Sequence, residues 1–165
     1  MKFKTTLLAL SSFAFFSLVV ISCKKSNSSS SSGQVTATIG STAWSSNVPT
    51  SGLYVTNAST FEIGGEYLKS GDTSALAISF LTPFILHGAI SSDTAGVDVG
   101  YVNATTLAEY DGGGVAGHSL LTISSWDSVN HKISGTFSGV LYNISGGSDS
   151  LVVTNGSFTT AYTVQ

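Results

Sequence analysis

HKISGTFSGVLYN, residues 131–143, is the stretch that decides the fold. Large apolar side chains at Ile133, Phe137 and Leu141 alternate in it with polar ones. Successive side chains of a β-strand point to opposite faces, so a period of two predicts a strand with one buried face. The decisive segment is therefore a long strand rather than a helix.

The same alternation recurs along most of the chain. Its apolar members are Val35, Ala37 and Ile39; Phe61, Ile63 and Tyr67; Leu76, Ile78 and Phe80; Val97, Val99 and Tyr101; and Phe158 and Tyr162. The segments between these runs are too short for the helical crossovers that parallel strands need. About nine to eleven short strands predict an all-β domain. We expect an antiparallel β-sandwich, with a closed or partly open β-barrel as the alternative.

Glycine and asparagine mark where the backbone departs from a regular strand. Asn155-Gly156 lies between two apolar runs, 151–154 and 158–162, and predicts a two-residue type I′ hairpin turn there. Gly135 and Gly139 fall on the buried face of the decisive strand. We expect a bend of the sheet or a close backbone contact at both.

Composition and charge exclude several classes of protein. Charged residues make up 9% of the 165, and the chain has 6 lysines, no arginine and 9 acids. Residues 34–165 hold two of those lysines and all nine acids, so this part is acidic and unsuited to nucleic acid. One cysteine rules out a disulfide within the chain.

The first residues have the three parts of an export signal. Lys2 and Lys4 precede an apolar run, residues 7–21. A helix of that length rises about 22 Å, which is short of the roughly 30 Å hydrocarbon core. A secretory signal therefore fits better than a permanent membrane span.

Val20-Ile21-Ser22-Cys23 resembles the bacterial lipobox. The resemblance implies diacylglyceryl transfer to the Cys23 thiol and cleavage between Ser22 and Cys23. The alternative is cleavage by the ordinary signal peptidase, with Cys23 incidental. Residues 24–33 (KKSNSSSSSG) have nothing to bury and predict a flexible tether with a reach of roughly 16–19 Å. We thus expect a signal peptide over 1–22, a lipidated cysteine and linker over 23–33, and one all-β domain over 34–165.

Four short segments carry a resemblance to small β-rich lipoproteins of Bacteroidota, from domain families without an assigned function. These segments are VTATIGSTAW (35–44), SLLTISSW (119–126), HKISGTFSGVLYN (131–143) and VTNGSFTTAY (153–162). The resemblance implies an exported lipoprotein of the cell envelope, in the outer membrane, with no family activity to carry over. Lys24 and Lys25 stand where surface-exported members carry acids, which favours the periplasmic face over the cell surface.

Three tripeptides, at 93–95, 127–129 and 149–151, resemble the Bacteroidota O-glycosylation motif of Asp, then Ser or Thr, then an aliphatic residue. The resemblance implies glycans on Thr94, Ser128 and Ser150.

Catalytic and metal-binding patterns are weak. No two of the three histidines lie at i, i+2 on one strand, and a lone cysteine gives no zinc motif. Asp93, Asp98 and Asp111 offer oxygens for Ca²⁺ but lack the spacing of a calcium loop. The chain has no G-x-S-x-G elbow. We expect no catalytic residue, no metal and no cofactor.

Aromatic side chains give the best binding hypothesis, because flat rings stack on sugar faces. The candidates are Trp44, Trp126, Tyr54, Tyr101, Tyr110 and Tyr142. The alternative is that they pack in the core. Tyr142 lies on the strand face opposite Leu141 and is the best candidate for an exposed stacking ring.

The sequence therefore predicts a lipid-anchored envelope protein with a non-catalytic structural or interaction role. The alternative is a binding module for glycans or another extracellular ligand. A hydrolase with a site assembled from loops is the third hypothesis. The expected partners are the membrane, through the lipid anchor, and a glycan or protein ligand.

Overall fold

The computed structural model describes residues 33–113 and 117–165, and this part of the chain is almost entirely β-structure. Its strands are β1 (Gln34–Ile39), β2 (Thr42–Ser45), β3 (Ser51–Val55), β4 (Thr60–Lys69), β5 (Asp72–Leu81), β6 (Ala89–Ser91), β7 (Asp98–Asn103), β8 (Ala108–Asp111), β9 (His118–Asp127), β10 (Lys132–Asn143) and β11 (Ser150–Val164). A single turn of helix, α2 (Ser92–Ala95), follows β6. The all-β prediction is confirmed.

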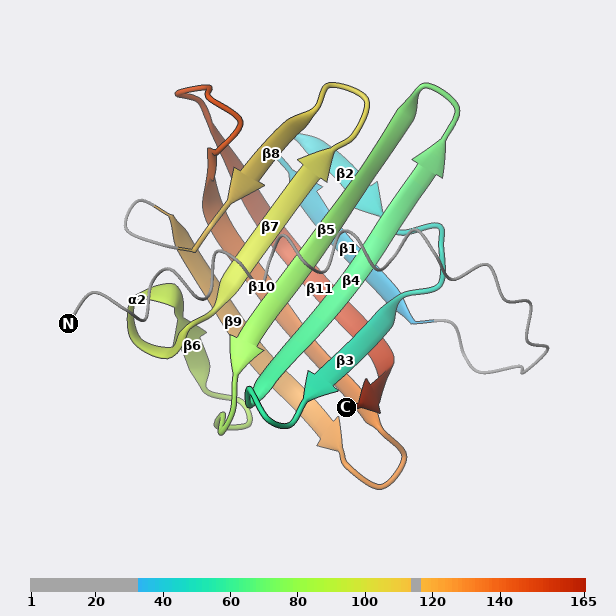
Figure 1. Cartoon of the computed structure of the whole chain (residues 1–165), viewed down its shortest axis with the longest axis vertical. Helices are drawn as coiled ribbons and strands as arrows, with labels where there is room; N and C mark the ends of the chain where they lie inside the picture. The colour runs from blue at the N-terminus through green and yellow to red at the C-terminus, as the bar shows by residue number, and fades with distance from the viewer. Residues whose placement is uncertain (1–32, 114–116) are drawn as a thin grey trace.

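The strands form one sheet in the order β2-β1-β11-β3-β4-β5-β7-β8-β10-β9-β6, and β11 also pairs with β10. Figure 1 shows the sheet folded over on itself, with β4, β5 and β7 in front of β1, β10 and β11. The two facing layers are thus continuous through hydrogen bonds, where a simple sandwich has two separate sheets. Among the described strands, β3 with β11 is the parallel pair, and the others are antiparallel.

The apolar side chains predicted from the alternation fill the space between the layers. Fully buried examples are Phe61, Ile63, Leu76, Ile78, Phe80, Ile133, Leu141 and Val35. Burial of this apolar surface is the main favourable contribution to folding. The rings of Phe61 and Phe80 stack with centroids 5.3 Å apart, and Tyr162 meets Phe61 edge-on at 5.0 Å.

The close backbone contacts predicted at the two glycines of β10 are confirmed, and the strand pairing is irregular beside both. The register between β10 and β9 shifts at Ser134/Gly135, and that between β10 and β11 shifts at Phe137/Gly139. A Cβ atom on Gly135 would lie 2.5 Å from the Thr122 carbonyl oxygen. Only glycine therefore allows the strands to approach at this point.

The predicted hairpin turn at Asn155-Gly156 is wrong, because both residues lie inside the continuous strand β11. Asn155 has the positive φ of 52° that the pair favours, but it forms a bulge instead of a turn. β11 pairs with β1 and β10 on both sides of this bulge, and both registers shift there. Pairing along both edges keeps the strand extended past a local turn signal.

The turns gather at two ends of the domain. One end, which we call the upper end after Figure 1, has the turns at 70–71, 104–107 and 144–149. The other, the lower end, has the turn at 56–59, the loop 82–88, the hairpin 128–131 and Gln165. Along ten-residue β5 the ends are about 30 Å apart. No helix in the described residues is long and apolar enough to cross a membrane.

Candidate binding pocket

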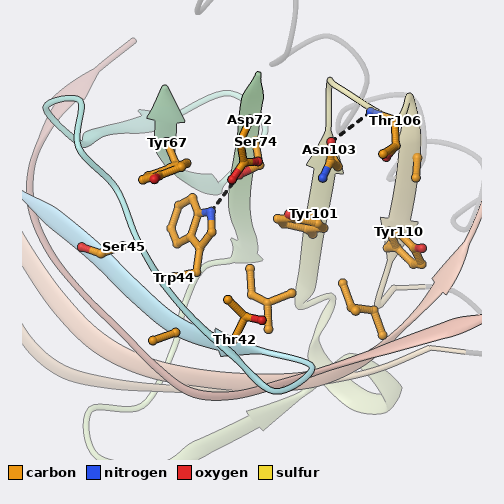
Figure 2. Close-up of a pocket in the computed structure, with 14 residues that line it drawn as sticks. Thr42, Trp44, Ser45, Tyr67, Asp72, Ser74, Tyr101, Asn103, Thr106 and Tyr110 are labelled. Carbon is orange, nitrogen blue, oxygen red and sulfur yellow. Dashed lines mark hydrogen bonds between the residues drawn. The ribbon is translucent and has the colours of Figure 1, made fainter. Parts of the chain in front are cut away.

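A pocket of about 440 Å³ opens at the upper end, between the β1–β2 hairpin and the front layer. Four aromatic side chains line it: Trp44, Tyr67, Tyr101 and Tyr110. Figure 2 shows these rings on the walls and floor of the pocket, with Asp72 and Asn103 above them. Its volume falls within the roughly 300–1,000 Å³ of ligand sites.

Trp44 is the most firmly held of the four rings. It lies on β2 and is buried, and its indole nitrogen donates a hydrogen bond to the Ser74 hydroxyl at 2.9 Å. Ser74 is itself buried on β5, in the facing layer. The bond therefore joins the two layers and fixes the ring before any ligand binds.

Tyr101 and Tyr110 face each other across neighbouring strands. They are register partners of β7 and β8, and their ring centroids lie 6.3 Å apart. The Tyr110 hydroxyl donates a hydrogen bond to Asp149 at 2.7 Å. This bond raises the pKa of Tyr110 and lowers the pKa of Asp149. The Tyr110 ring is thereby tied to the turn between β10 and β11.

The pocket has a slightly acidic polar rim. Among the described residues that line it, Asp72 carries the formal charge, and no lysine or histidine lies on the wall. The side-chain oxygen of Asn103, Oδ1, accepts hydrogen bonds from the backbone N–H groups of Thr105 and Thr106, both at 3.0 Å. The side-chain amide nitrogen of Asn103 points toward the pocket in Figure 2. Such a wall suits neutral or cationic ligands with a flat apolar face better than anions.

Half of the predicted aromatic candidates come together here, and half do not. Trp44, Tyr101 and Tyr110 line the pocket. Tyr54 and Trp126 belong instead to the cluster of rings around Phe61, toward the lower end.

Tyr142 is exposed on the face opposite Leu141, as predicted, but it lies outside the residues that line the pocket. Tyr67 was missed as a site residue because its place in the alternation of β4 marked it as core. The sequence did offer one indication, because Tyr67 is the most polar member of the set formed by Phe61, Ile63 and Tyr67.

A second feature is a pair of carboxyl groups, Asp98 and Asp111, near the start of β7 and the end of β8. Asp98 is only 6% exposed. Burial, and then the neighbouring Asp111, raise the pKa of Asp98 to about 7. Its Oδ1 atom has no hydrogen-bond partner among the described residues. Asp111 accepts a hydrogen bond from the backbone of Gly113.

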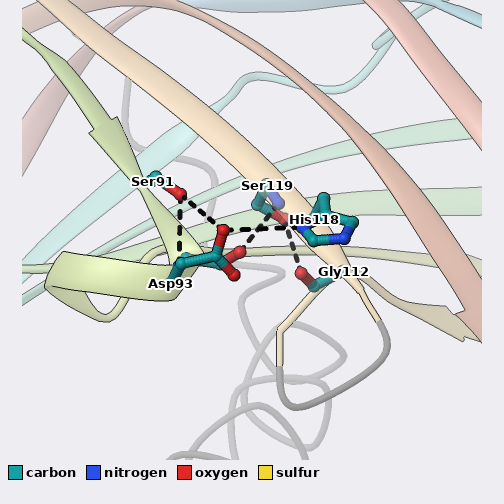
Figure 3. A network of polar contacts seen from close by, with 6 residues as sticks. Ser91, Asp93, Gly112, His118 and Ser119 are labelled. Atoms are coloured by element: carbon teal, nitrogen blue, oxygen red, sulfur yellow. Dashed lines mark hydrogen bonds and ion pairs between the residues drawn. The ribbon is translucent and has the colours of Figure 1, made fainter.

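Asp93, the third acid considered as a Ca²⁺ ligand, lies apart from this pair. It contacts His118 instead, with 3.6 Å between Asp93 Oδ2 and His118 Nδ1, and both side chains are largely exposed (Figure 3). In the described ranges, no three metal-binding side chains gather into a site. The Ser119 hydroxyl beside His118 is buried and donates to the Gly112 carbonyl at 3.0 Å. It is thus engaged in holding the chain rather than presented to solvent.

The residues predicted to be modified lie in different places. Ser22 and Cys23 fall outside the described residues. Ser128 is exposed in the hairpin 128–131, and Ser150 is exposed at the start of β11. Thr94 lies in α2. Glycosylation of these three stays a prediction.

No family model, no curated protein and no solved structure matches this chain.

Proposed function

We propose that the chain is a lipid-anchored protein of the cell envelope whose β-domain is a non-catalytic binding module for a neutral glycan. The observation that supports this is the pocket with four aromatic rings and a single acid on its wall. It favours a binding role over a purely structural one.

The pocket chemistry fits a sugar ring. The apolar C–H face of a sugar lies against aromatic rings, and its hydroxyls need hydrogen-bond partners at the edge of the site. Trp44 and Tyr101 supply rings, while Asp72 and Asn103 supply an acceptor and an amide. Because Trp44 is already fixed by Ser74, binding costs little ordering of that side chain.

The proposed location of the protein in the cell is argued from the sequence alone. The lipobox-like segment ending at Cys23 supports an anchor, and Lys24 and Lys25 support the periplasmic face of the outer membrane. Several acyl chains are needed for a stable anchor, since one chain binds only marginally.

Tryptophan fluorescence tests the binding proposal, because the chain has 2 tryptophans and one lies in the pocket. In W126F, Trp44 is the sole reporter. We expect its emission to change saturably with at least one of a panel of neutral oligosaccharides built from glucose, galactose, mannose or N-acetylglucosamine.

The matched variants are Y101A and Y142A in the same background. Y101A removes a ring of the pocket and should weaken the response about tenfold or more, which corresponds to about 1.4 kcal/mol. Y142A removes an exposed ring outside the pocket and should change the affinity less than twofold. A flat titration with every sugar of the panel, or equal losses in both variants, contradicts the proposal.

A further inference from the structure

The lower end of the domain exposes large apolar side chains on two segments. Ile85 in the loop 82–88 is 77% exposed, and Val129 in the hairpin 128–131 is 85% exposed. Leu86 and Trp126 beside them are also exposed. We call these four residues the apolar tip.

The tip is held in place by the aromatic cluster beneath it. Phe84 packs on Trp126 with ring centroids 5.2 Å apart, which links the loop 82–88 to the end of β9 that leads into the hairpin. The Trp126 indole donates a hydrogen bond to the Tyr162 hydroxyl at 2.8 Å. The backbone of His87 donates to the Ile123 carbonyl at 2.8 Å. The exposed side chains thus project from anchored segments.

Charge is distributed unevenly between the two ends. Neither the loop 82–88 nor the hairpin 128–131 contains an acid, and they carry His87 and His131. Lys132 follows the hairpin, opposite Asp127 in the register. At the upper end lie Asp72, Glu109 and Asp149, with Lys69 opposite Asp72 in the register. The lower end is therefore the less acidic of the two and the better suited to an anionic lipid surface.

The chain also enters the domain on the side of the tip. Gln34 pairs with Thr159, and Thr159 pairs with Ser134, two residues from the end of β10 at the hairpin. Gly33, which precedes Gln34, forms an isolated β-bridge with Thr50. From its composition the ten-residue segment after Cys23 has an expected reach of roughly 16–19 Å. A bilayer that holds Cys23 would lie within reach of the tip.

We propose that the apolar tip docks into the lipid bilayer to which the chain is anchored, so that the pocket faces away from the membrane. The proposal rests on the proposed lipid anchor. On docking, the side chains of Ile85 and Val129 transfer from water to the edge of the acyl-chain region. Trp126 then lies at the membrane–water interface, where tryptophan is favoured. The rigid β-structure then holds the pocket about 30 Å from the lipid surface.

Quenching by brominated lipid tests this orientation in the lipidated full-length mature chain, reconstituted into phosphatidylcholine–phosphatidylglycerol vesicles with brominated acyl chains. W44F leaves Trp126 as the reporter of the tip, and W126F leaves Trp44 as the reporter of the pocket. We expect at least twofold quenching of Trp126 and none of Trp44. Equal quenching of the two, or no quenching of Trp126, overturns the proposal.

The matched variants place a charge at either end. I85D combined with V129D in the W44F background should abolish Trp126 quenching. L107D is the control, because Leu107 is 78% exposed in the upper turn 104–107, and it should leave the quenching unchanged. Persistent quenching in the I85D/V129D variant overturns the proposal, as does a glycan on Ser128 in the intact mass, since a hydrated sugar would keep the hairpin out of the lipid.

Vesicle flotation separates this proposal from the anchor. A chain that floats without Trp126 quenching overturns the docking of the tip alone. A chain that does not float overturns the anchor, and with it the tip, whose proximity to the bilayer depends on that anchor.

Discussion

At the scale of single residues, Asp98 has the environment with the clearest physical consequence. Its carboxyl group is buried beside Asp111, and its pKa is raised from 3.8 to about 7. The folded domain therefore binds a proton that the unfolded chain releases between about pH 4 and pH 7. The stability that this proton contributes is fully present below the pKa of the unfolded state, and it is lost as the pH rises through the pKa of the folded state.

Asp98→Asn should remove this pH dependence. At about 1.4 kcal/mol per pKa unit, the free energy of unfolding of the wild type should fall by on the order of 3–4 kcal/mol from pH 4 to pH 8. The variant, which cannot ionise here, should be more stable than the wild type at pH 8. Urea denaturation across this pH range measures both, with exposed Asp72→Asn as the control. An unchanged slope in Asp98→Asn would mean that another group binds the proton.

Tyr110 offers a second test at this scale, at the edge of the pocket. Its hydroxyl lowers the pKa of Asp149 more than any other contact does, and Asn143 contributes next. Tyr110→Phe removes that donor, so the pKa of Asp149 should rise toward its ordinary value. Carboxyl carbon shifts in an NMR titration measure it, and Tyr142→Phe should leave it unmoved. An unaltered Asp149 pKa in Tyr110→Phe would refute the pairing.

At the scale of elements, β10 shows how a strand tolerates neighbours that come unusually close. A methyl group at Gly135 would meet the Thr122 carbonyl at 2.5 Å and the Phe158 ring at 2.7 Å. Gly135→Ala should thus cost about 1–3 kcal/mol of unfolding free energy, as overpacking does.

Gly88→Ala is the matched control, because its new Cβ atom would lie at an ordinary 3.4 Å from Ile85. It should change stability by no more than about 0.5 kcal/mol. Chemical denaturation of both variants makes the comparison, and equal losses would show that the close approach at Gly135 relaxes without cost.

The same elements show how far the sequence could be read. Alternation places Ile133, Phe137 and Leu141 in the core because the period of a strand is a local property. The turn predicted at Asn155-Gly156 was wrong because a residue with positive φ occurs in bulges as well as in turns. The pairing of β11 with both β1 and β10 decides between the two, and that pairing is not visible in the local sequence.

The pocket depends on long-range pairing in the same way. Trp44 and Tyr101 were recognisable as candidate rings, but they meet only through the folding of the sheet. No local pattern reports that the β1–β2 hairpin lies over β5 and β7, so the grouping could not be predicted. Tyr67 shows the converse, since a side chain on the core face of β4 becomes part of the wall where the layers part.

At the scale of the whole molecule, the anchor and the domain make separate predictions. Cys23→Ala removes the sulfur that would carry the lipid, so the chain should appear as soluble or uncleaved protein. Palmitate labelling and membrane fractionation measure this, and Ser22→Ala, which keeps a small residue before the cysteine, is the control. Unchanged labelling and fractionation of Cys23→Ala would refute the anchor.

The position of β11 has a consequence for how the domain is made. It pairs with β1, β3 and β10, and it follows every other described strand in chain order. Until the ribosome has added residues 150–164, neither β1 nor β10 has its central partner, and the two layers cannot close. The nascent domain consequently stays open until the residues of β11 have left the ribosome, and closure of the two layers is a late step in its folding.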